Sequence, residues 1–197
     1  MEINLMNSLR GALARRRLLM SSSIDNNDII YQLPKETTFN GVSDYINTGI
    51  KLFDVAQTFT LYVRADLSQG TSYYSPVFHC MYEQSPYYGL ALQNRYLLGN
   101  GSATNQYSPS QFLAQDNQRI VVVFDNGIMT QAYYRQVTNP LIINENHFND
   151  VMKQANLILG AYQRVDGAIG RYWQGTIYEF KIYDRVLSDV EINNLFI

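Results

Sequence analysis

The sequence predicts an all-β domain, a sandwich of two antiparallel sheets, and three observations support this. The composition favours strands, because 16 Tyr and 9 Phe accompany a charged fraction of only 16%, and aromatic side chains suit a half-buried pleated surface. Residues 58–67 alternate apolar and polar side chains, the period of a strand with one buried face. After residue 28, short apolar segments recur between turn residues with no long helical pattern, which is typical of antiparallel sheets.

The first 28 residues differ from the rest of the chain. Residues 1–23 carry four arginines against Glu2 alone, a local balance of +3 in a chain of net charge −2. Apolar residues recur there at near-helical spacing, so we expect a short amphipathic helix and then a polar linker. Because a free terminus frays unless something ties it down, we expect this arm to anchor the protein on a partner or a neighbouring copy. The anchoring candidates are Arg10, Leu13, Arg15, Arg16, Arg17 and Leu18.

The domain boundary is therefore predicted near residue 28. Residues 1–28 form a basic amphipathic arm and linker, and residues 29–197 form the sandwich. The arginines interrupt the apolar run of the arm, which argues against a secretory signal. No run of about 18 apolar residues exists, so we expect no membrane span. A net charge of −2 also argues against nucleic acid as a specific partner.

The strands are expected in a regular succession. Arg119–Phe124 is nearly all apolar and predicts a central strand. Asp125-Asn126-Gly127 then predicts a tight turn into a partner strand over 129–137, because Asn and Gly accept positive φ. Long loops are expected over 99–115 and 138–154. The remaining strands are expected at 28–33, 38–39, 45–47, 58–67, 77–83, 89–98, 156–162 and 176–183.

The C-terminal residues predict one short helix. Ser188 and Glu191 have the spacing of a capping box, in which each side chain bonds the other residue's backbone N–H. Ile192, Leu195 and Phe196 give this helix an apolar face.

Three segments together resemble a known family. The segment Trp173–Leu195 resembles the closing signature of laminin-G-like, concanavalin A-like domains of the lectin and glucanase superfamily, Leu159-Gly160 resembles a strand start of that family, and Phe39–Ile46 resembles its opening element. The resemblance covers roughly residues 30–197. It implies a jelly-roll sandwich in which the two chain ends are neighbours and Tyr45 and Ile46 contribute to the core.

Catalysis is not expected. Many members of the superfamily are glycoside hydrolases that place two carboxylates on one strand, whereas no second carboxylate is in register with Glu179. His79 and Cys80 are adjacent in a strand and therefore point to opposite faces. Cys80 is the single cysteine, and we expect it to be a buried thiol without a disulfide.

Cofactors and metals are not expected either. Val123 stands where legume-type lectins need an acidic metal ligand. Some laminin-G modules hold Ca²⁺ at the rim of the sandwich through carboxylates, but the candidates here form no recognisable loop. These candidates are Asp116, Asp125, Asp150 and Asp166.

Tyrosines crowd one part of the chain and are candidates for ligand or interface contact. Tyrosine offers a large contact area and a hydroxyl for hydrogen bonds, which suits sugar rings and protein interfaces equally, and several tyrosines could instead simply pack in strands. The candidates are Tyr73, Tyr74, Tyr82, Tyr87, Tyr88 and Tyr107.

Three functions remain open. An Arg- and Leu-rich start ahead of such a domain resembles bacteriophage virion proteins such as head fibres, decoration proteins or tail components. This resemblance favours a non-enzymatic virion protein that forms homo-oligomers. Its arm would bind other virion proteins, and its sandwich would be displayed toward host-surface glycans. The alternatives are an extracellular, free-standing lectin-like module that binds carbohydrate and, least favoured, a glycan hydrolase.

Overall fold

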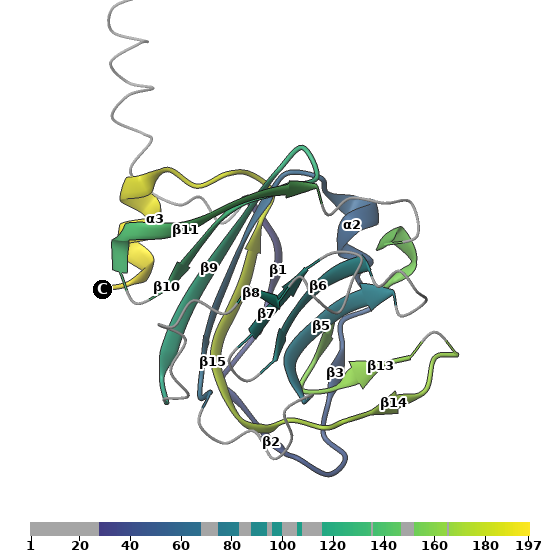
Figure 1. The fold of residues 1–197 in the computed structure, drawn as a ribbon. Helices are drawn as coiled ribbons and strands as arrows, with labels where there is room; N and C mark the ends of the chain where they lie inside the picture. Colours follow the sequence, from purple (N-terminus) through teal and green to yellow (C-terminus); the bar gives the residue numbers. More distant parts are fainter. Residues whose placement is uncertain are drawn as a thin grey trace, which may run out of the picture.

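The computed structural model shows a sandwich of two antiparallel sheets with a short helix at its C-terminal end (Figure 1). The residues it describes are 28–67, 75–82, 88–93, 96–99, 106–107, 116–134, 136–146, 152–164 and 166–197. Within them, no helix is long and apolar enough to cross a membrane.

Sheet A has seven strands among the described residues, in the order β1-β15-β4-β9-β10-β11, with β2 also paired to β15. The first strand of the chain thus lies beside the last. The bounds are β1 Ile29–Gln32, β2 Thr37–Asn40, β4 Phe59–Ala65, β9 Gln118–Asp125, β10 Ile128–Tyr134, β11 Gln136–Asn146 and β15 Gln174–Tyr183.

Sheet B has six strands in the described part, in the order β3-β12-β5-β6-β7-β8. Its bounds are β3 Ile46–Asn47, β5 Pro76–Tyr82, β6 Tyr88–Gln93, β7 Tyr96–Gly99, β8 Gln106–Tyr107 and β12 Ile158–Leu159. The two short strands β13 (Tyr162–Gln163) and β14 (Ile169–Gly170) pair separately. Two short helical turns, α2 (Leu52–Val55) and η2 (Met152–Gln154), lie next to each other.

The main core fills the space between the sheets, and strand alternation produces it. In β4 the side chains of Phe59, Leu61, Val63 and Ala65 point into this core, while the intervening residues point to the outer face, as the alternation predicts. The ring of Phe59 stacks on that of Phe124 in β9, with centroids 4.6 Å apart. Such pairs contribute about 0.5–1.5 kcal/mol beyond the burial of their area.

The predicted turn at Asp125-Asn126-Gly127 is confirmed. Asn126 and Gly127 have φ of 49° and 77°, and β10 pairs directly back on β9 from Ile128 opposite Asp125. Two consecutive positive φ values suit the right-handed twist of a hairpin, which explains the residue types found there.

Several strand expectations were wrong. The loop expected over 138–154 is largely strand, because β11 continues to Asn146 at the edge of sheet A. Pro140 is tolerated there since an edge strand leaves one side of its backbone unpaired. The strand expected over 89–98 is the hairpin of β6 and β7. The expected loop over 99–115 contains β8, and the four-residue α2 is too short to show a helical period.

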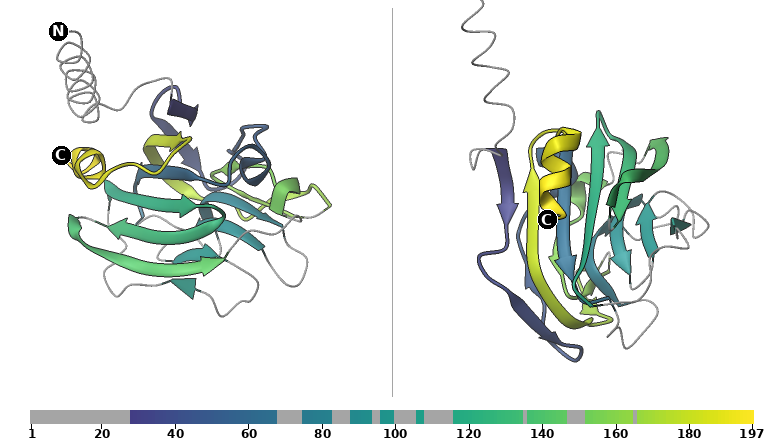
Figure 2. Two further views of the ribbon diagram at one scale, coloured as in Figure 1. Left: turned by 90° about the horizontal axis from the view of Figure 1, so that it is seen from above. Right: turned by 90° about the vertical axis from the view of Figure 1, so that its left-hand side faces the viewer.

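The C-terminal helix α3 (Asp189–Leu195) lies on the outer face of sheet A (Figures 1 and 2). A second apolar cluster forms beneath it, where Leu187 and Ile192 pack with Tyr62 and Tyr183. The predicted capping box is confirmed, with Ser188 and Glu191 in their expected roles. Sheet A is therefore covered on both faces at this end.

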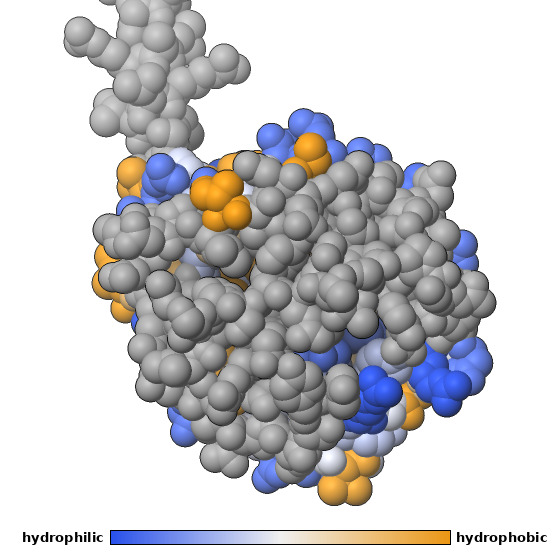
Figure 3. All heavy atoms as spheres, in the orientation of Figure 1, coloured by the Kyte–Doolittle hydropathy of each residue, from blue (hydrophilic) through white to orange (hydrophobic). Residues whose placement is uncertain are grey.

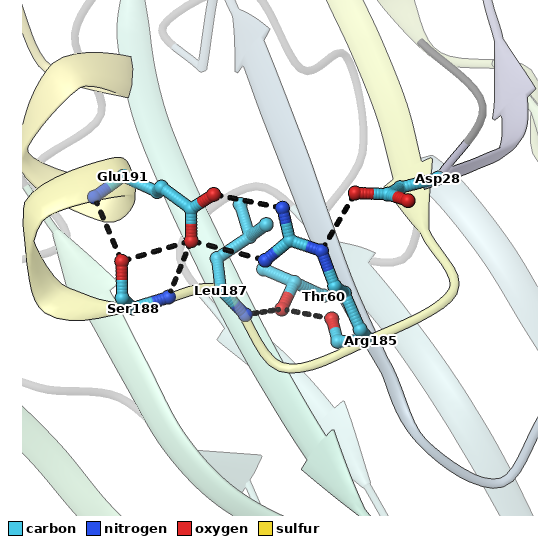
Figure 4. Close-up of polar contacts among 6 residues, drawn as sticks. All are labelled: Asp28, Thr60, Arg185, Leu187, Ser188 and Glu191. Atoms are coloured by element: carbon cyan, nitrogen blue, oxygen red, sulfur yellow. Dashed lines mark hydrogen bonds and ion pairs between the residues drawn. The ribbon is translucent and has the colours of Figure 1, made fainter. Parts of the chain in front are cut away.

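Arg185 joins this helix to the start of the domain (Figure 4). Its Nε donates to the Asp28 carboxylate at 2.7 Å, and its terminal nitrogens donate to both Glu191 oxygens at 2.7 and 3.0 Å. Thr60 Oγ1 donates to the Arg185 carbonyl at 2.8 Å and accepts from the Leu187 N–H at 3.0 Å. We call Asp28, Arg185 and Glu191 the end clasp. It places residue 28 beside the end of β15, so the expected proximity of the two ends is confirmed for the described chain.

Three distant segments meet at one packing junction, formed by Phe39, Gly160 and Trp173. The rings of Phe39 and Trp173 are 5.8 Å apart, and the backbone N–H of Trp173 donates to the Gly160 carbonyl at 2.8 Å. Gly160 has φ of 76°, and a Cβ added there would clash with the Phe39 ring. Each segment belongs to one of the motifs that carried the family resemblance, so these motifs form a single contact in space.

The junction predicts a large cost for Gly160→Ala. A side chain at this positive φ is strained by about 1 kcal/mol, and displacing the buried Phe39 ring adds about 1–3 kcal/mol. Urea unfolding should therefore show a loss of about 3 kcal/mol. Gly167→Ala is the control, since Gly167 has φ of 83° but nothing within 4 Å of its Cβ position, and it should lose only about 1 kcal/mol. Equal losses in the two variants would contradict the packing argument.

The end clasp predicts a pH-dependent contribution to stability. Hydrogen bonds from Arg185 lower the pKa of Glu191 from its ordinary value to about 2, so the ionised form is favoured in the folded state. The ionised carboxylate contributes fully to the free energy of unfolding above the unfolded pKa of 4.5, and this contribution disappears as pH falls toward 2. Glu191→Gln should lower the free energy of unfolding by about 2 kcal/mol at pH 7. This lies between the values for exposed and buried ion pairs, because Glu191 is buried while Arg185 is partly exposed.

Urea unfolding at about pH 7, 4 and 2.5 gives the free energy of unfolding of wild type and of Glu191→Gln. The difference between the two should become smaller as the pH falls. Glu179→Gln serves as the control, because that carboxylate is 36% exposed in its pairs with Arg64 and Lys181. It should change stability by under about 1 kcal/mol. A constant gap at all three pH values would show that the ionised carboxylate is not what stabilises the clasp.

Candidate functional site

The structure places three of the six tyrosine candidates and leaves three outside the described residues. The backbones of Tyr82, Tyr88 and Tyr107 lie in β5, β6 and β8, so all three belong to sheet B. Tyr82 and Tyr88 are directly paired across two of these strands. Tyr73, Tyr74 and Tyr87 lie outside the described part of the chain. Ligand contact by this set stays a prediction.

The anchoring candidates also lie outside the described residues. This applies to Arg10, Leu13, Arg15, Arg16, Arg17 and Leu18. What the structure does place is Asp28, which is held in the end clasp at the point where the arm would leave the domain.

The acidic candidates for calcium are not brought together. Asp116 and Asp125 lie at opposite ends of β9, where Asp125 accepts a 3.4 Å bond from Thr58. Asp166 accepts a bond from the Ala168 N–H at 3.0 Å, and Asp150 lies outside the described residues. In the part of the chain that the structure describes, no three His, Cys, Asp or Glu residues gather as a metal site.

Cys80 and His79 point to opposite faces of β5, as predicted. Cys80 is fully buried in the main core, and burial raises the pKa of its thiol to about 12. A thiol with such a pKa is protonated and unreactive at neutral pH. His79 points to the outer face of sheet B, where its backbone neighbours in the adjacent strands are Ile158 and Ala91.

A hairpin made by β13 and β14 begins and ends at the packing junction. Gly160 precedes it and Trp173 follows it, and the Gly160 N–H donates to the Val77 carbonyl of β5 at 2.9 Å. At its tip, the Arg164 N–H donates to the Ala168 carbonyl at 2.9 Å. The hairpin packs against β5 and extends beyond sheet B in Figure 1. In Figure 3 the described surface at the lower right, on the side of the hairpin, carries both hydrophilic and hydrophobic residues.

Three side chains form a stack between this hairpin and sheet B. The Arg171 guanidinium lies 4.8 Å from the centre of the Tyr162 ring, and that ring lies 4.5 Å from the imidazole of His79. Arg171 is exposed, whereas Tyr162 and His79 are buried, with exposed fractions of 4% and 1%. The stack thus places a cation at the surface over two buried rings, an arrangement that contributes about 0.5–1 kcal/mol at exposed sites.

The backbone of Arg171 is unusual. Its φ is 50°, a left-handed conformation that is uncommon outside glycine. This conformation ends β14, because a residue with positive φ cannot continue an extended strand. The neighbouring residues Tyr172 and Trp173 then take separate directions, with Trp173 buried in the main core and Tyr172 partly exposed. Backbone strain of this kind is often found at binding sites.

A second aromatic contact involves Tyr172, the residue that follows Arg171 in the chain. The rings of Tyr45 and Tyr172 are 6.3 Å apart and tilted by 44°. Tyr45 was expected in the core, but it is 43% exposed, whereas Ile46 packs against the core as expected. The correction follows from the edge position of β3, which leaves the residue before the strand at the rim of the sandwich.

We call Tyr45, His79, Tyr162, Arg171 and Tyr172 the hairpin site. Apart from His79, none of these residues was a candidate from the sequence. They come from separate segments, and only the isolated, short apolar stretch around residues 158–163 could have indicated an unusual connection there. The geometry offers one exposed cation, two partly exposed rings and two buried polar side chains.

The structure also shows the surroundings of Glu179, the carboxylate considered for hydrolysis. It pairs with Lys181 Nζ at 3.0 Å and with Arg64 at 3.5 Å in sheet A. These ion-pair partners are cations, whereas most glycoside hydrolases place a second carboxylate opposite the first. Hydrolysis therefore gains no support from this residue.

Comparison with known proteins identifies relatives by fold. No protein-family model and no curated protein matches the chain. The CBM40 module of the Ruminococcus gnavus IT-sialidase, solved with α2,3-sialyllactose bound, matches with a TM-score of 0.58 at 15% identity, over 84% of this chain and 98% of the module.

Larger proteins match over part of their length. A Trypanosoma rangeli sialidase mutant with trans-sialidase activity has a TM-score of 0.61 at 17% identity, over 86% of this chain and 28% of that chain. The leech intramolecular trans-sialidase has a TM-score of 0.57 at 16% identity, over 85% of this chain and 28% of that chain. The chain thus spans under a third of these enzymes. At such identities the likeness shows the fold alone: the predicted sandwich is confirmed as the fold shared with the CBM40 module, and these matches carry no link to bacteriophages.

Proposed function

We propose that the protein is a non-catalytic carbohydrate-binding module and that the hairpin site binds an acidic glycan. The observation that carries the proposal is the exposed Arg171 guanidinium over the ring of Tyr162, followed in the chain by Tyr172, whose ring contacts that of Tyr45. A fold shared with a sialyllactose-bound module over nearly the whole module length supports it. This favours the lectin-like alternative over the virion hypothesis, which stays a prediction.

Arg171 suits a carboxylate on the ligand. A guanidinium presents parallel N–H donors that match the two oxygens of a carboxylate, and it is less strongly hydrated than an ammonium group. Contact with the Tyr162 ring holds this guanidinium at the surface of the unliganded chain.

Tyr45 and Tyr172 suit the faces of sugar rings. Both are partly exposed, and each has an apolar ring surface with a hydroxyl at its edge. A sugar presents C–H groups on one face and hydroxyls around its perimeter, so it can contact a tyrosine ring and stay hydrogen-bonded. The tilt of 44° between the two rings gives an angled rather than a flat contact surface.

The absence of catalysis is part of the proposal. Glu179 is paired with two cations, and it lies on sheet A, whereas the hairpin site lies at the outer face of sheet B. The module would therefore hold a glycan without cleaving it. Incubation with sialyllactose should release no sialic acid, and steady release would overturn this part.

The proposal predicts binding of α2,3-sialyllactose that depends on Arg171. Isothermal titration should show weaker binding of lactose, which lacks the carboxylate, and roughly a tenfold or greater loss of sialyllactose affinity in Arg171→Ala. That loss corresponds to about 1.4 kcal/mol, close to the range for a hydrogen bond to a charged group.

Arg164→Ala is the matched control, because Arg164 is an exposed arginine of the same hairpin whose side chain pairs with Asp166 at 3.8 Å. It removes the same charge and should leave the affinity within about twofold. Equal losses in both variants would indicate general attraction to positive charge, and a glycan array with no binding of any acidic sugar would reject the proposed function.

A further inference from the structure

His79 and Tyr162 hold three buried polar atoms without hydrogen-bond partners. These atoms are Nδ1 and Nε2 of His79 and the hydroxyl of Tyr162. The two rings are in contact, so the three atoms belong to one place in the molecule. Elsewhere in the described chain, atoms of this kind occur singly, at Arg119 Nε and Trp173 Nε1.

This arrangement is costly for the unliganded fold. A buried donor or acceptor without a partner loses its hydrogen bonds to water and regains nothing. Native proteins leave few such groups, and each one needs an explanation. Replacing either residue by phenylalanine would keep the aromatic packing and remove the unpaired atoms, so packing alone does not require His79 or the Tyr162 hydroxyl.

The protonation state of His79 restricts what these atoms can bind. Burial, assisted by the positive charge of Arg171, lowers the pKa of His79 to about 3. The imidazole is therefore neutral at ordinary pH, with one donor and one acceptor nitrogen. The Tyr162 hydroxyl also donates and accepts. Such a pair complements an uncharged group with both abilities, such as a hydroxyl, rather than an anion.

We propose that His79 and Tyr162 form a subsite of the hairpin site that hydrogen-bonds a hydroxyl group of the glycan while Arg171 holds its carboxylate. This deepens the proposed function and rests on it. Arg171 is the exposed residue that lies over the Tyr162 ring, so binding requires its guanidinium to move off this ring and admit the hydroxyl group of the glycan to the buried atoms. The subsite makes His79 and Tyr162 determinants of specificity, since a site built to bond a hydroxyl rejects an analogue that lacks it.

The test uses Tyr162→Phe and His79→Phe in the full chain, with melting temperature and α2,3-sialyllactose affinity measured for each. Both variants should melt at or above the wild-type temperature, because they remove unpaired polar atoms, and both should bind roughly tenfold or more weakly. A residue with a purely structural role would change melting without changing affinity. The double variant should lose less binding free energy than the sum of the losses in the two single variants, because both residues bond the same group of the ligand.

Tyr133→Phe is the matched control. It also removes a tyrosine hydroxyl, but one that donates to Gln131 Oε1 at 2.6 Å on sheet A. It should lower the melting temperature and leave affinity unchanged, the opposite of the pattern expected at the subsite.

The outcomes separate the two proposals. If wild type binds sialyllactose and both phenylalanine variants bind equally well, the subsite is wrong and the proposed function stands. If the variants melt lower with unchanged affinity, the three atoms serve a structural water instead, and the subsite is again wrong. If wild type binds no acidic glycan, the proposed function fails and the subsite with it.

Discussion

The packing of Gly160 against the Phe39 ring is the contact on which much of the structure depends. The missing side chain at residue 160 lets the chain turn away from sheet B at a positive φ, and the carbonyl of the same residue accepts the backbone N–H of Trp173. The chain therefore leaves sheet B at Gly160 and comes back beside the same residue at Trp173, and the intervening residues form the β13–β14 hairpin. Trp173 then leads directly into β15, the strand that pairs with β1, β2 and β4. One contact thus positions both the hairpin and the last strand of sheet A.

The end clasp completes the other end of β15. Arg185 follows this strand and bonds Asp28 before β1 and Glu191 in α3, so the strand is held by packing at its start and by charge at its finish. The two contacts respond to different conditions. Packing at Gly160 is insensitive to pH, whereas the clasp depends on ionised carboxylates and weakens in acid. The seven-residue helix α3 is too short to be stable without tertiary contacts, which the outer cluster and the clasp both supply.

The features that could be predicted from the sequence are those that depend on local periodicity and local chemistry. The alternation in β4, the Asn126-Gly127 turn and the capping box at Ser188 and Glu191 each involve residues close in the chain, and each is confirmed. The strand β11 was missed because an edge strand with polar residues and Pro140 lacks the apolar pattern of a buried one.

The hairpin site was missed for a different reason. His79, Tyr162 and Arg171 come into contact, as do Tyr45 and Tyr172, only through sheet pairing and the Gly160 junction. No local sequence pattern indicates contacts between segments so far apart in the chain. Inside a regular sheet, side chains alternate between a packed and an outer face. At the hairpin, the left-handed Arg171 breaks this alternation and allows a surface cation, a buried phenol and a buried imidazole to stack. Because the same sandwich can carry unrelated functions, this departure from regular structure, and not the sheets, is what would select a ligand for this chain.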